Sequence, residues 1–201
     1  INEKLAITLK KNMPEVEVIT GDIQDEFVKE KVIKLSKKRD VNMIIGGPPC
    51  QGYSMKGKKL GLEDPRNFLF IEFLNLVQRI QPDVFVIENV KSILSTSKGW
   101  FKDEIISEIQ KLDYHVDFGI LKAIDFGVPQ TRERAIFICC KVKKIPLPLP
   151  TVKNIVTVKD AIFDLAYLDS NEGDFEQYYL NAPKSKYQQL MRGNNDKLYN
   201  H

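Results

Sequence analysis

A cysteine stands in a stretch rich in glycine and proline, Gly46-Gly47-Pro48-Pro49-Cys50-Gln51-Gly52. Glycine lets a backbone turn sharply and approach a ligand closely, and proline stiffens the segment that it joins. A thiol held on such a loop could act as a nucleophile once it is ionised. Because a lone cysteine is more often inert packing and a Gly-Pro cluster is more often a tight turn, this loop by itself leaves both interpretations open.

Glu88 and Asn89 directly follow an apolar run at residues 84–87. A carboxylate at the carboxyl end of a buried strand loses part of its hydration, which raises its pKa toward the range that a proton donor needs near neutral pH. An acid that only caps the next segment is the alternative interpretation. On these residues alone, Glu88 is a candidate acid that needs further support.

Two arginines, Arg132 and Arg134, stand immediately before a further apolar run at residues 135–140. Guanidinium groups bind carboxylates and phosphates through several fixed donors, so one arginine could enter a cleft while the other meets a neighbour or a phosphate. The alternative is a solvated turn in which Glu133 pairs with the arginines. These residues add a third candidate stretch.

The segments that must position these residues predict an α/β fold, with a mostly parallel sheet flanked by helices, because helical stripes alternate with short apolar runs. The runs predict strands at residues 16–20, 43–45, 84–87, 116–121 and 135–140. Apolar residues at helical spacing predict helices at residues 5–13, 28–39, 64–80 and 101–112. In open parallel sheets ligands bind beyond the carboxyl ends of the strands, where the Cys50 loop and Glu88 would both lie.

The character of the chain changes after residue 144. Prolines at every second position of residues 145–150 exclude a helix or a central strand and predict an extended connector. Short helices are expected near residues 158–165 and 184–191. We therefore divide the chain into a catalytic region at residues 1–144 and a connector with peripheral helices at residues 145–201.

Composition narrows the class of protein. Hydrophobic residues make up 43% of 201 residues, enough for a real core, and the net charge of +3 is too small to name a partner. The three cysteines and two histidines have no metal-ligand spacing, and Cys139 and Cys140 are expected in the core. With no long apolar span and no signal-like start, we expect a soluble, cytoplasmic, monomeric protein without a metal site.

The ordered combination of the three stretches resembles a known family. Pro48-Pro49-Cys50-Gln51, then Glu88-Asn89-Val90, then Gln130-Thr131-Arg132-Glu133-Arg134 match in order and spacing the signature blocks of the DNA (cytosine-5) methyltransferases. The resemblance covers about residues 1–165. It implies a Rossmann-like fold for S-adenosylmethionine-dependent methyl transfer to C5 of cytosine in double-stranded DNA.

The resemblance also implies roles for the central residues. Cys50 would add to C6 of a flipped-out cytosine and produce an enamine at C5. Glu88 would face N3 and the exocyclic amine of that base, where it could share a proton. Asn89 would hold the backbone of Pro48-Pro49 in position.

Contacts to the nucleic acid follow from the same resemblance. Arg134 would contact O2 of the cytosine, and Arg132 would meet the backbone phosphate beside the flipped nucleotide. Gln51, Ser54 and Arg66 are the expected DNA contacts of the loop that follows the cysteine.

The methyl donor would be bound by residues from several elements. Asp22 is similar to the family's acceptor for the adenine amino group, with Ile23 packing nearby. Pro49 and Leu69 would line the same pocket, and Ile1 matches an apolar residue on the adenine face. The family's Phe-x-Gly-x-Gly loop would precede Ile1, so one or more N-terminal strands of the fold are expected before this chain.

Several alternatives stay open. A tRNA methyltransferase shares the cysteine, glutamate and arginine blocks, although its Cys-Phe-Thr signature is absent from this chain. A non-catalytic DNA-binding paralogue is a second alternative, and a cysteine hydrolase lacks a plausible base. By analogy with the family, we expect a bacterial or phage restriction-modification enzyme whose recognition domain would begin near His201.

Overall fold

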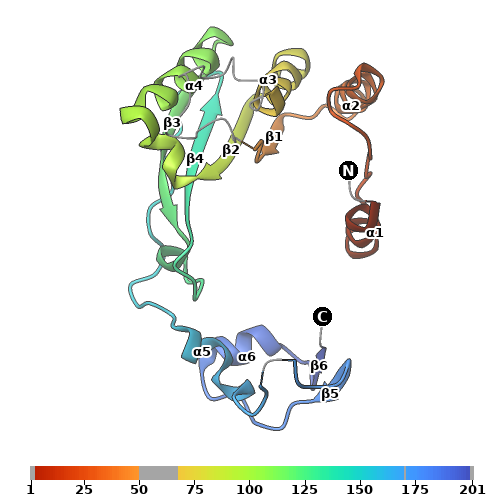
Figure 1. Cartoon of the computed structure of the whole chain (residues 1–201), viewed down its shortest axis with the longest axis vertical. Helices are drawn as coiled ribbons and strands as arrows, with labels where there is room; N and C mark the ends of the chain where they lie inside the picture. Colours follow the sequence, from red (N-terminus) through yellow and green to blue (C-terminus); the bar gives the residue numbers. More distant parts are fainter. Residues whose placement is uncertain (1–2, 50–67, 170, 200–201) are drawn as a thin grey trace. The chain divides into compact units, whose positions relative to one another are not determined.

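The computed structural model describes residues 3–49, 68–169 and 171–199. The chain divides into two compact units (Figure 1). The first comprises residues 1–120 and 134–147, and the second comprises residues 121–133 and 148–201. The candidate residues Glu88, Asn89 and Arg134 belong to the first unit, which is therefore described first.

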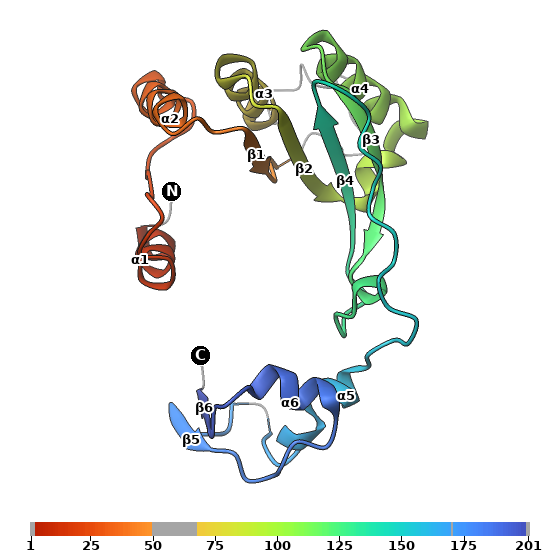
Figure 2. The same ribbon diagram turned by 180° about the vertical axis from the view of Figure 1, so that it is seen from behind.

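A four-stranded sheet forms the centre of the first unit, in the order β1 (Met43–Gly46), β2 (Val84–Val90), β4 (Glu133–Cys140) and β3 (His115–Lys122). Figure 2 shows these strands from behind. The α/β class is as predicted, but the described sheet is mixed, since β1 pairs parallel to β2 and β2 pairs antiparallel to β4. The connection at residues 123–132 is too short for a parallel crossover, so the chain turns back directly.

Two helices, α3 (Phe68–Ile80) and α4 (Trp100–Lys111), cover one face of this sheet (Figure 1). The expected face of α4 is buried through Phe101, Ile105 and Ile109. On α3 the deepest residues are Phe70, Leu74 and Val77, so the buried stripe is rotated slightly from the predicted one. Together with Phe85, Ile87, Ala135, Phe137 and Cys139 of the strands, these side chains form the main core.

The helix α2 (Glu26–Lys38) packs on α3. Asp25 caps its N-terminus by accepting a hydrogen bond from the Phe27 amide, and Lys37 and Lys38 occupy its last turn as expected. Before it, α1 (Glu3–Asn12) ends just ahead of Pro14, which also agrees with the prediction.

The stripe predicted for α1 exists, and its side chains are exposed, with Leu5 at 67% and Met13 at 47%. One expectation about the first forty residues needs correction. Residues 16–20 do not form the predicted strand, because Val16 lies in a bend and residues 17–20 have no regular secondary structure. A strand exists through hydrogen bonds to a neighbour, and none of the described segments pairs with these residues.

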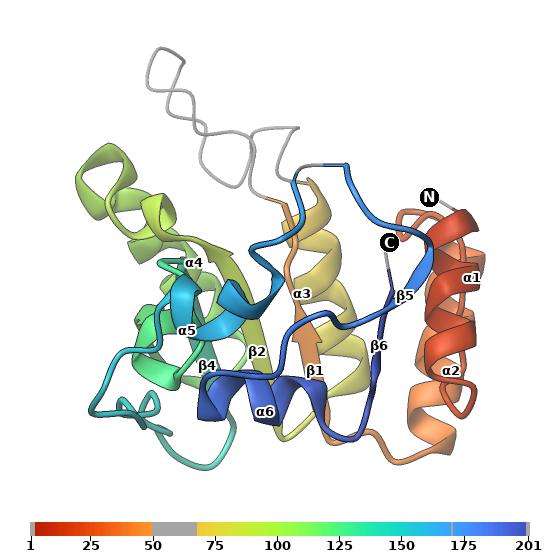
Figure 3. The ribbon, with the colours of Figure 1, turned by 90° about the horizontal axis from the view of Figure 1, so that it is seen from below.

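The second unit is built from short elements. It contains the 3-10 helices η5 (Ala123–Phe126) and η6 (Phe163–Leu165), the helices α5 (Val158–Ile162) and α6 (Lys186–Arg192), and the antiparallel pair β5 (Glu176–Tyr178) and β6 (Lys197–Tyr199). Figure 3 shows β5 beside β6. The expected connector at residues 145–150 has no regular structure, and both expected helices are present but shorter. The β5–β6 pair was not predicted.

Candidate active site

The strand β2 is longer than its apolar run, and Glu88 and Asn89 lie within it rather than after it. Its pairing with β4 continues to Val90, which lies opposite Arg134. Burial alternates along the strand, so Phe85, Ile87 and Asn89 face the helices. Glu88 therefore projects from the opposite face of the sheet.

Glu88 and Arg134 form an ion pair across the two strands. Nε of Arg134 lies 2.7 Å from Oε1 of Glu88. The register explains this contact, because Glu88 pairs with Ile136 and the side chain of Arg134 is its diagonal neighbour on the same face. The structure therefore brings together two of the three candidate stretches.

Glu88 is more exposed than the sequence predicted, since a carboxylate at the end of a buried strand was expected to lose part of its hydration. The side chain of Glu88 is 41% exposed and that of Arg134 is 28% exposed. The carboxylate is thus held on an open face of the sheet by a guanidinium group, and burial at the end of a strand does not describe its surroundings. What Glu88 offers a ligand is a fixed, accessible acceptor.

Asn89 ties β2 to the segment that leads to the cysteine. Its Nδ2 donates a hydrogen bond of 3.0 Å to the carbonyl oxygen of Pro48, and its Oδ1 accepts one of 2.9 Å from the Val90 amide. Asn89 is only 7% exposed. A buried amide with both ends bonded restricts its partners firmly, so Asn89 holds the backbone at Pro48.

Two glycines lie where this segment leaves β1, and both have close neighbours. A Cβ atom on Gly46 would lie 2.3 Å from the ring of Phe73, which is closer than real Cβ contacts. A Cβ atom on Gly47 would lie 3.2 Å from Oε2 of Glu88. Gly46 therefore rests directly on the aromatic ring from α3, and Gly47 leaves space beside the carboxylate.

The remaining candidate residues are placed as follows. Asp22 lies in a turn before α2, where its Oδ1 accepts a hydrogen bond of 2.9 Å from the Gln24 amide. Ile23 and Leu69 are half-buried, and Pro49 is exposed. Five predicted site residues lie outside the described part of the chain: Ile1, Cys50, Gln51, Ser54 and Arg66.

Arg132 lies just before β4 in the second unit. Its carbonyl oxygen accepts a hydrogen bond of 2.9 Å from the Ala123 amide, and the residue is exposed. Its neighbour Glu133 pairs with Lys122 at 3.8 Å. These contacts hold the turn that leads into β4.

The sequence analysis missed two groups near the site, Phe73 beneath Gly46 and the ion pair of Lys29 with Glu72 between α2 and α3. Aromatic and charged residues on amphipathic helices carry no local signal of such contacts. The core position of Cys139 and Cys140 was predicted, and burial raises the pKa of the Cys139 thiol well above its usual value.

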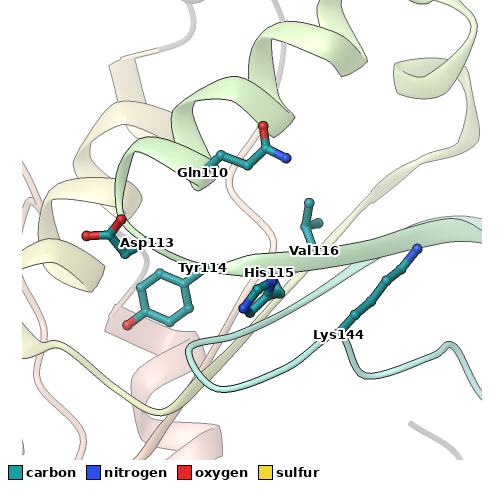
Figure 4. Close-up of a pocket in the computed structure, with 6 residues that line it drawn as sticks. All are labelled: Gln110, Asp113, Tyr114, His115, Val116 and Lys144. Atoms are coloured by element: carbon teal, nitrogen blue, oxygen red, sulfur yellow. The ribbon is translucent and has the colours of Figure 1, made fainter.

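A separate hollow of about 560 Å³ lies beside the start of β3 (Figure 4). It is lined by Gln110, Asp113, Tyr114, His115, Val116 and Lys144. The pairing of Val84 with Cys140 places the end of β4 beside the start of β2. Lys144, which lines the hollow, follows this end of β4, whereas Glu88 and Arg134 lie toward the other end of the β2–β4 pair. The hollow is therefore remote from Glu88 and Arg134.

Within the described ranges, no group of three or more His, Cys, Asp or Glu residues could hold a metal ion. None of the helices in those ranges is long and apolar enough to cross a membrane.

Comparison with known proteins adds independent information. Residues 1–200 match the family model described as C-5 cytosine-specific DNA methylase. The chain is 41% identical over 201 residues to Type II methyltransferase M.DdeI of Desulfomicrobium norvegicum, covering 94% of this chain and 47% of that protein. It is 38% identical over 155 residues to Type II methyltransferase M.AquIA of Picosynechococcus sp., covering 72% of this chain and 62% of that protein.

Solved structures agree with the fold. One described as a prophage-encoded DNA modification methyltransferase (E. coli) has a TM-score of 0.69 at 30% identity, over 94% of this chain and 55% of that one. An Entamoeba histolytica methyltransferase, EhMeth, has a TM-score of 0.59 at 24% identity, over 86% of this chain and 51% of that one. The chain thus spans about half the length of several of the proteins that it matches.

Proposed function

The chain belongs to the C-5 cytosine-specific DNA methylase family, and from this premise we propose that it carries the catalytic residues of an enzyme that methylates C5 of cytosine in double-stranded DNA. The observation that carries the proposal is the Glu88–Arg134 pair, which lies beside the Gly47–Pro48 segment leading to Cys50. A carboxylate and a guanidinium group side by side offer an acceptor and donors for the edge of one base.

A restriction-modification system is the proposed setting. The relatives M.DdeI and M.AquIA are named Type II methyltransferases. Their identity to this chain supports a modification enzyme of this kind. The proposal further includes a bacterial or phage origin, a monomeric state and a cytoplasmic location. A recognition domain outside residues 1–201 would choose the DNA sequence.

In the proposed reaction the Cys50 thiolate adds to C6 of the flipped cytosine, which breaks the C5–C6 double bond and makes C5 nucleophilic. C5 then forms a bond to the methyl carbon as the bond from that carbon to the donor's sulfonium sulfur breaks, so a neutral thioether would leave. Loss of the C5 proton and departure of the Cys50 sulfur restore the double bond. The loop that holds Pro48 would present the thiol, since Asn89 fixes its backbone from the sheet.

Glu88 would recognise the pyrimidine and stabilise the charge that develops in it. Its carboxylate would face N3 and the exocyclic amine, and Arg134 would donate to O2 of the same ring. The ion pair supports this arrangement, because Arg134 already holds one carboxylate oxygen in a fixed direction. Arg132 would bind the phosphate beside the flipped nucleotide.

The residues present fit a donor with an adenine ring. The Asp22 turn offers a carboxylate acceptor next to the half-buried side chain of Ile23, which matches an amino group on the edge of an apolar ring. Leu69 and Pro49 would add apolar walls, and Ile1 would pack on the ring. S-adenosylmethionine, bound there, would supply an electrophilic methyl group.

The test is covalent trapping on the full-length protein with S-adenosylmethionine and duplex DNA that carries 5-fluorocytosine. The C5 hydrogen of cytosine leaves as a proton, but fluorine cannot leave as a cation, so the enzyme stays bound to the base. We expect a stable protein–DNA complex with the unaltered protein and none with Cys50→Ser. Parallel incubation with tRNA separates the alternatives. Trapping on tRNA alone would replace DNA as the substrate, and trapping on neither nucleic acid would leave a non-catalytic paralogue.

A further inference from the structure

Lys29 is buried although it lies on an amphipathic helix with many exposed lysines. It is 9% exposed, whereas Lys31, Lys34 and Lys37 of the same helix are exposed. An ammonium group is costly to bury unless it is paired and hydrogen-bonded. Its surroundings must therefore supply compensating charge.

That charge comes from two glutamates on different helices. Nζ of Lys29 lies 2.9 Å from Oε2 of Glu72 on α3 and 3.1 Å from Oε2 of Glu26 on α2. The side chain of Glu72 is only 17% exposed. The hydrogen bond to Glu72 is the largest cause of the raised pKa of Lys29, so the ammonium group of Lys29 is charged throughout the physiological range.

The same helices are joined a second time near the surface. Arg79 on α3 pairs with Glu26 at 2.5 Å and also with Glu30. These side chains are more exposed than Lys29 and Glu72. Exposed pairs contribute little, so among these ion pairs the Lys29–Glu72 contact is the more restrictive link between α2 and α3.

A buried ion pair is a weak source of stability, because apolar residues of similar volume often serve as well. Its distinctive property is direction, since a charged hydrogen bond is satisfied in one register of the two helices and lost in others. Such a pair can therefore act by fixing the relative positions of the groups that the two helices carry.

The N-terminus of α2 carries the Asp22 turn. The carbonyl of Asp22 accepts a hydrogen bond of 3.0 Å from the amide of Asp25, the capping residue of α2. A Cβ atom on Gly21 would lie 2.4 Å from Val28, so the turn folds back tightly on the helix. The turn must move with α2 as one body.

The first turns of α3 carry two further groups of the site. Leu69 lies one helical turn before Glu72, and Phe73 directly follows Glu72 and supports Gly46. Displacing α3 relative to α2 would therefore shift Leu69, and the Phe73 ring that supports Gly46, relative to the Asp22 turn.

We propose that Lys29 and Glu72 are positioning residues for the methyl donor, because their buried contact sets the spacing between the Asp22 turn on α2 and Leu69 on α3. This inference rests on the proposed function. The pair touches neither donor nor base, and it acts through the helices that do. Breaking it lowers donor affinity while leaving the cytosine-facing residues in place.

The experiment compares Lys29→Met, Glu72→Gln and the apolar pair Lys29→Met/Glu72→Met in the full-length protein. The matched control is Lys34→Met, which removes the same charge from an exposed position of α2. Calorimetric titration with S-adenosylmethionine gives the donor Kd without turnover. Urea unfolding gives stability, and trapping at saturating donor gives the rate of covalent attack.

We expect each single variant to raise the donor Kd roughly 3- to 30-fold, the range typical of supporting residues. The trapping rate at saturating donor should change less than about twofold, and the control should match the unaltered protein in every readout. The apolar pair should recover the urea midpoint without recovering donor affinity.

Two results would overturn the inference. One is an unchanged donor Kd in both single variants, and the other is an apolar pair that recovers donor affinity together with stability, which would reduce the contact to packing. If the unaltered protein bound no donor at all, the proposed function itself would fail, and that outcome is visible before any variant is made.

Discussion

Arg134 reaches Glu88 through Nε, one donor of a planar fork that lysine cannot reproduce. We expect Arg134→Lys to slow covalent trapping about 100-fold, the usual loss when a charge-stabilising donor is removed from a site. The free energy of unfolding should change by less than about 1 kcal/mol, because exposed ion pairs contribute little. Single-turnover trapping and urea unfolding measure the two effects.

The matched control for this variant is Arg39→Lys, since Arg39 also forms an exposed ion pair, at 2.8 Å with Glu17. It should leave trapping unchanged. A large loss of stability in Arg134→Lys, or normal trapping, would mean that the pair has a structural role only.

A substitution at Gly46 tests whether the Phe73 ring supports the segment that leads to Cys50. Gly46→Ala would place a methyl group 2.3 Å from the Phe73 ring, and overpacking of this kind costs about 1–3 kcal/mol. Phe73→Leu in the same chain should recover part of the lost stability, because the smaller side chain leaves room. Urea midpoints of the two single variants and the double variant give the coupling. Additive effects would contradict the contact.

At the scale of elements, Tyr114 fastens the start of β3 to the residues before β2. Its hydroxyl donates a hydrogen bond of 2.5 Å to the carbonyl of Pro82, and its ring packs edge-on against Phe85 with centroids 4.8 Å apart. Burial, reinforced by nearby Asp83, raises the pKa of Tyr114 from 10.0 to about 12. The neutral phenol is therefore the form that the fold requires.

This linkage has a definite sign. A folded-state pKa above the unfolded value contributes stability that is complete below pH 10 and is lost as the pH rises toward 12. Tyr114→Phe should be less stable by about 1 kcal/mol near pH 8, because the Pro82 carbonyl loses its donor. Its stability should fall less steeply between pH 10 and 12. Urea unfolding across that range checks this, and parallel pH curves would refute it.

At the scale of the whole molecule, the two units differ in what they bury. Every fully buried apolar side chain of the described residues lies in the first unit, whereas the second unit buries Asp164 and Gln188. Asp164 pairs there with Arg192, which also lies over the ring of Tyr179 at 3.7 Å. Polar burial contributes less net stability than an apolar core.

We therefore expect the second unit to open more readily than the first. Amides of α5 and α6 should exchange with solvent at least about tenfold faster than those of α4 and β4 under native conditions, as weakly cored regions do. Hydrogen exchange followed by mass spectrometry measures each element separately. Equal protection in all four would indicate that the chain opens as one cooperative body.

Helices and strands whose signal is local could be predicted from the sequence. The stripe of Phe101, Ile105 and Ile109 predicted α4, and Pro14 marked the end of α1, because side-chain periodicity and backbone restriction act within a few residues. The order of the cysteine, glutamate and arginine stretches indicated the family, since each role needs its own residue type.

Only the tertiary structure decided which of these residues meet. The register of β2 with β4 brings Arg134 to Glu88, and it also extends β2 beyond its apolar run. Residues 16–20 have the composition of a strand but lack a partner among the described segments. The sequence around Lys29 gives no local sign that it is buried, and only the packing of α3 places Glu72 beside it. Pairing, register and burial depend on segments far apart in the chain, and no local pattern contains them.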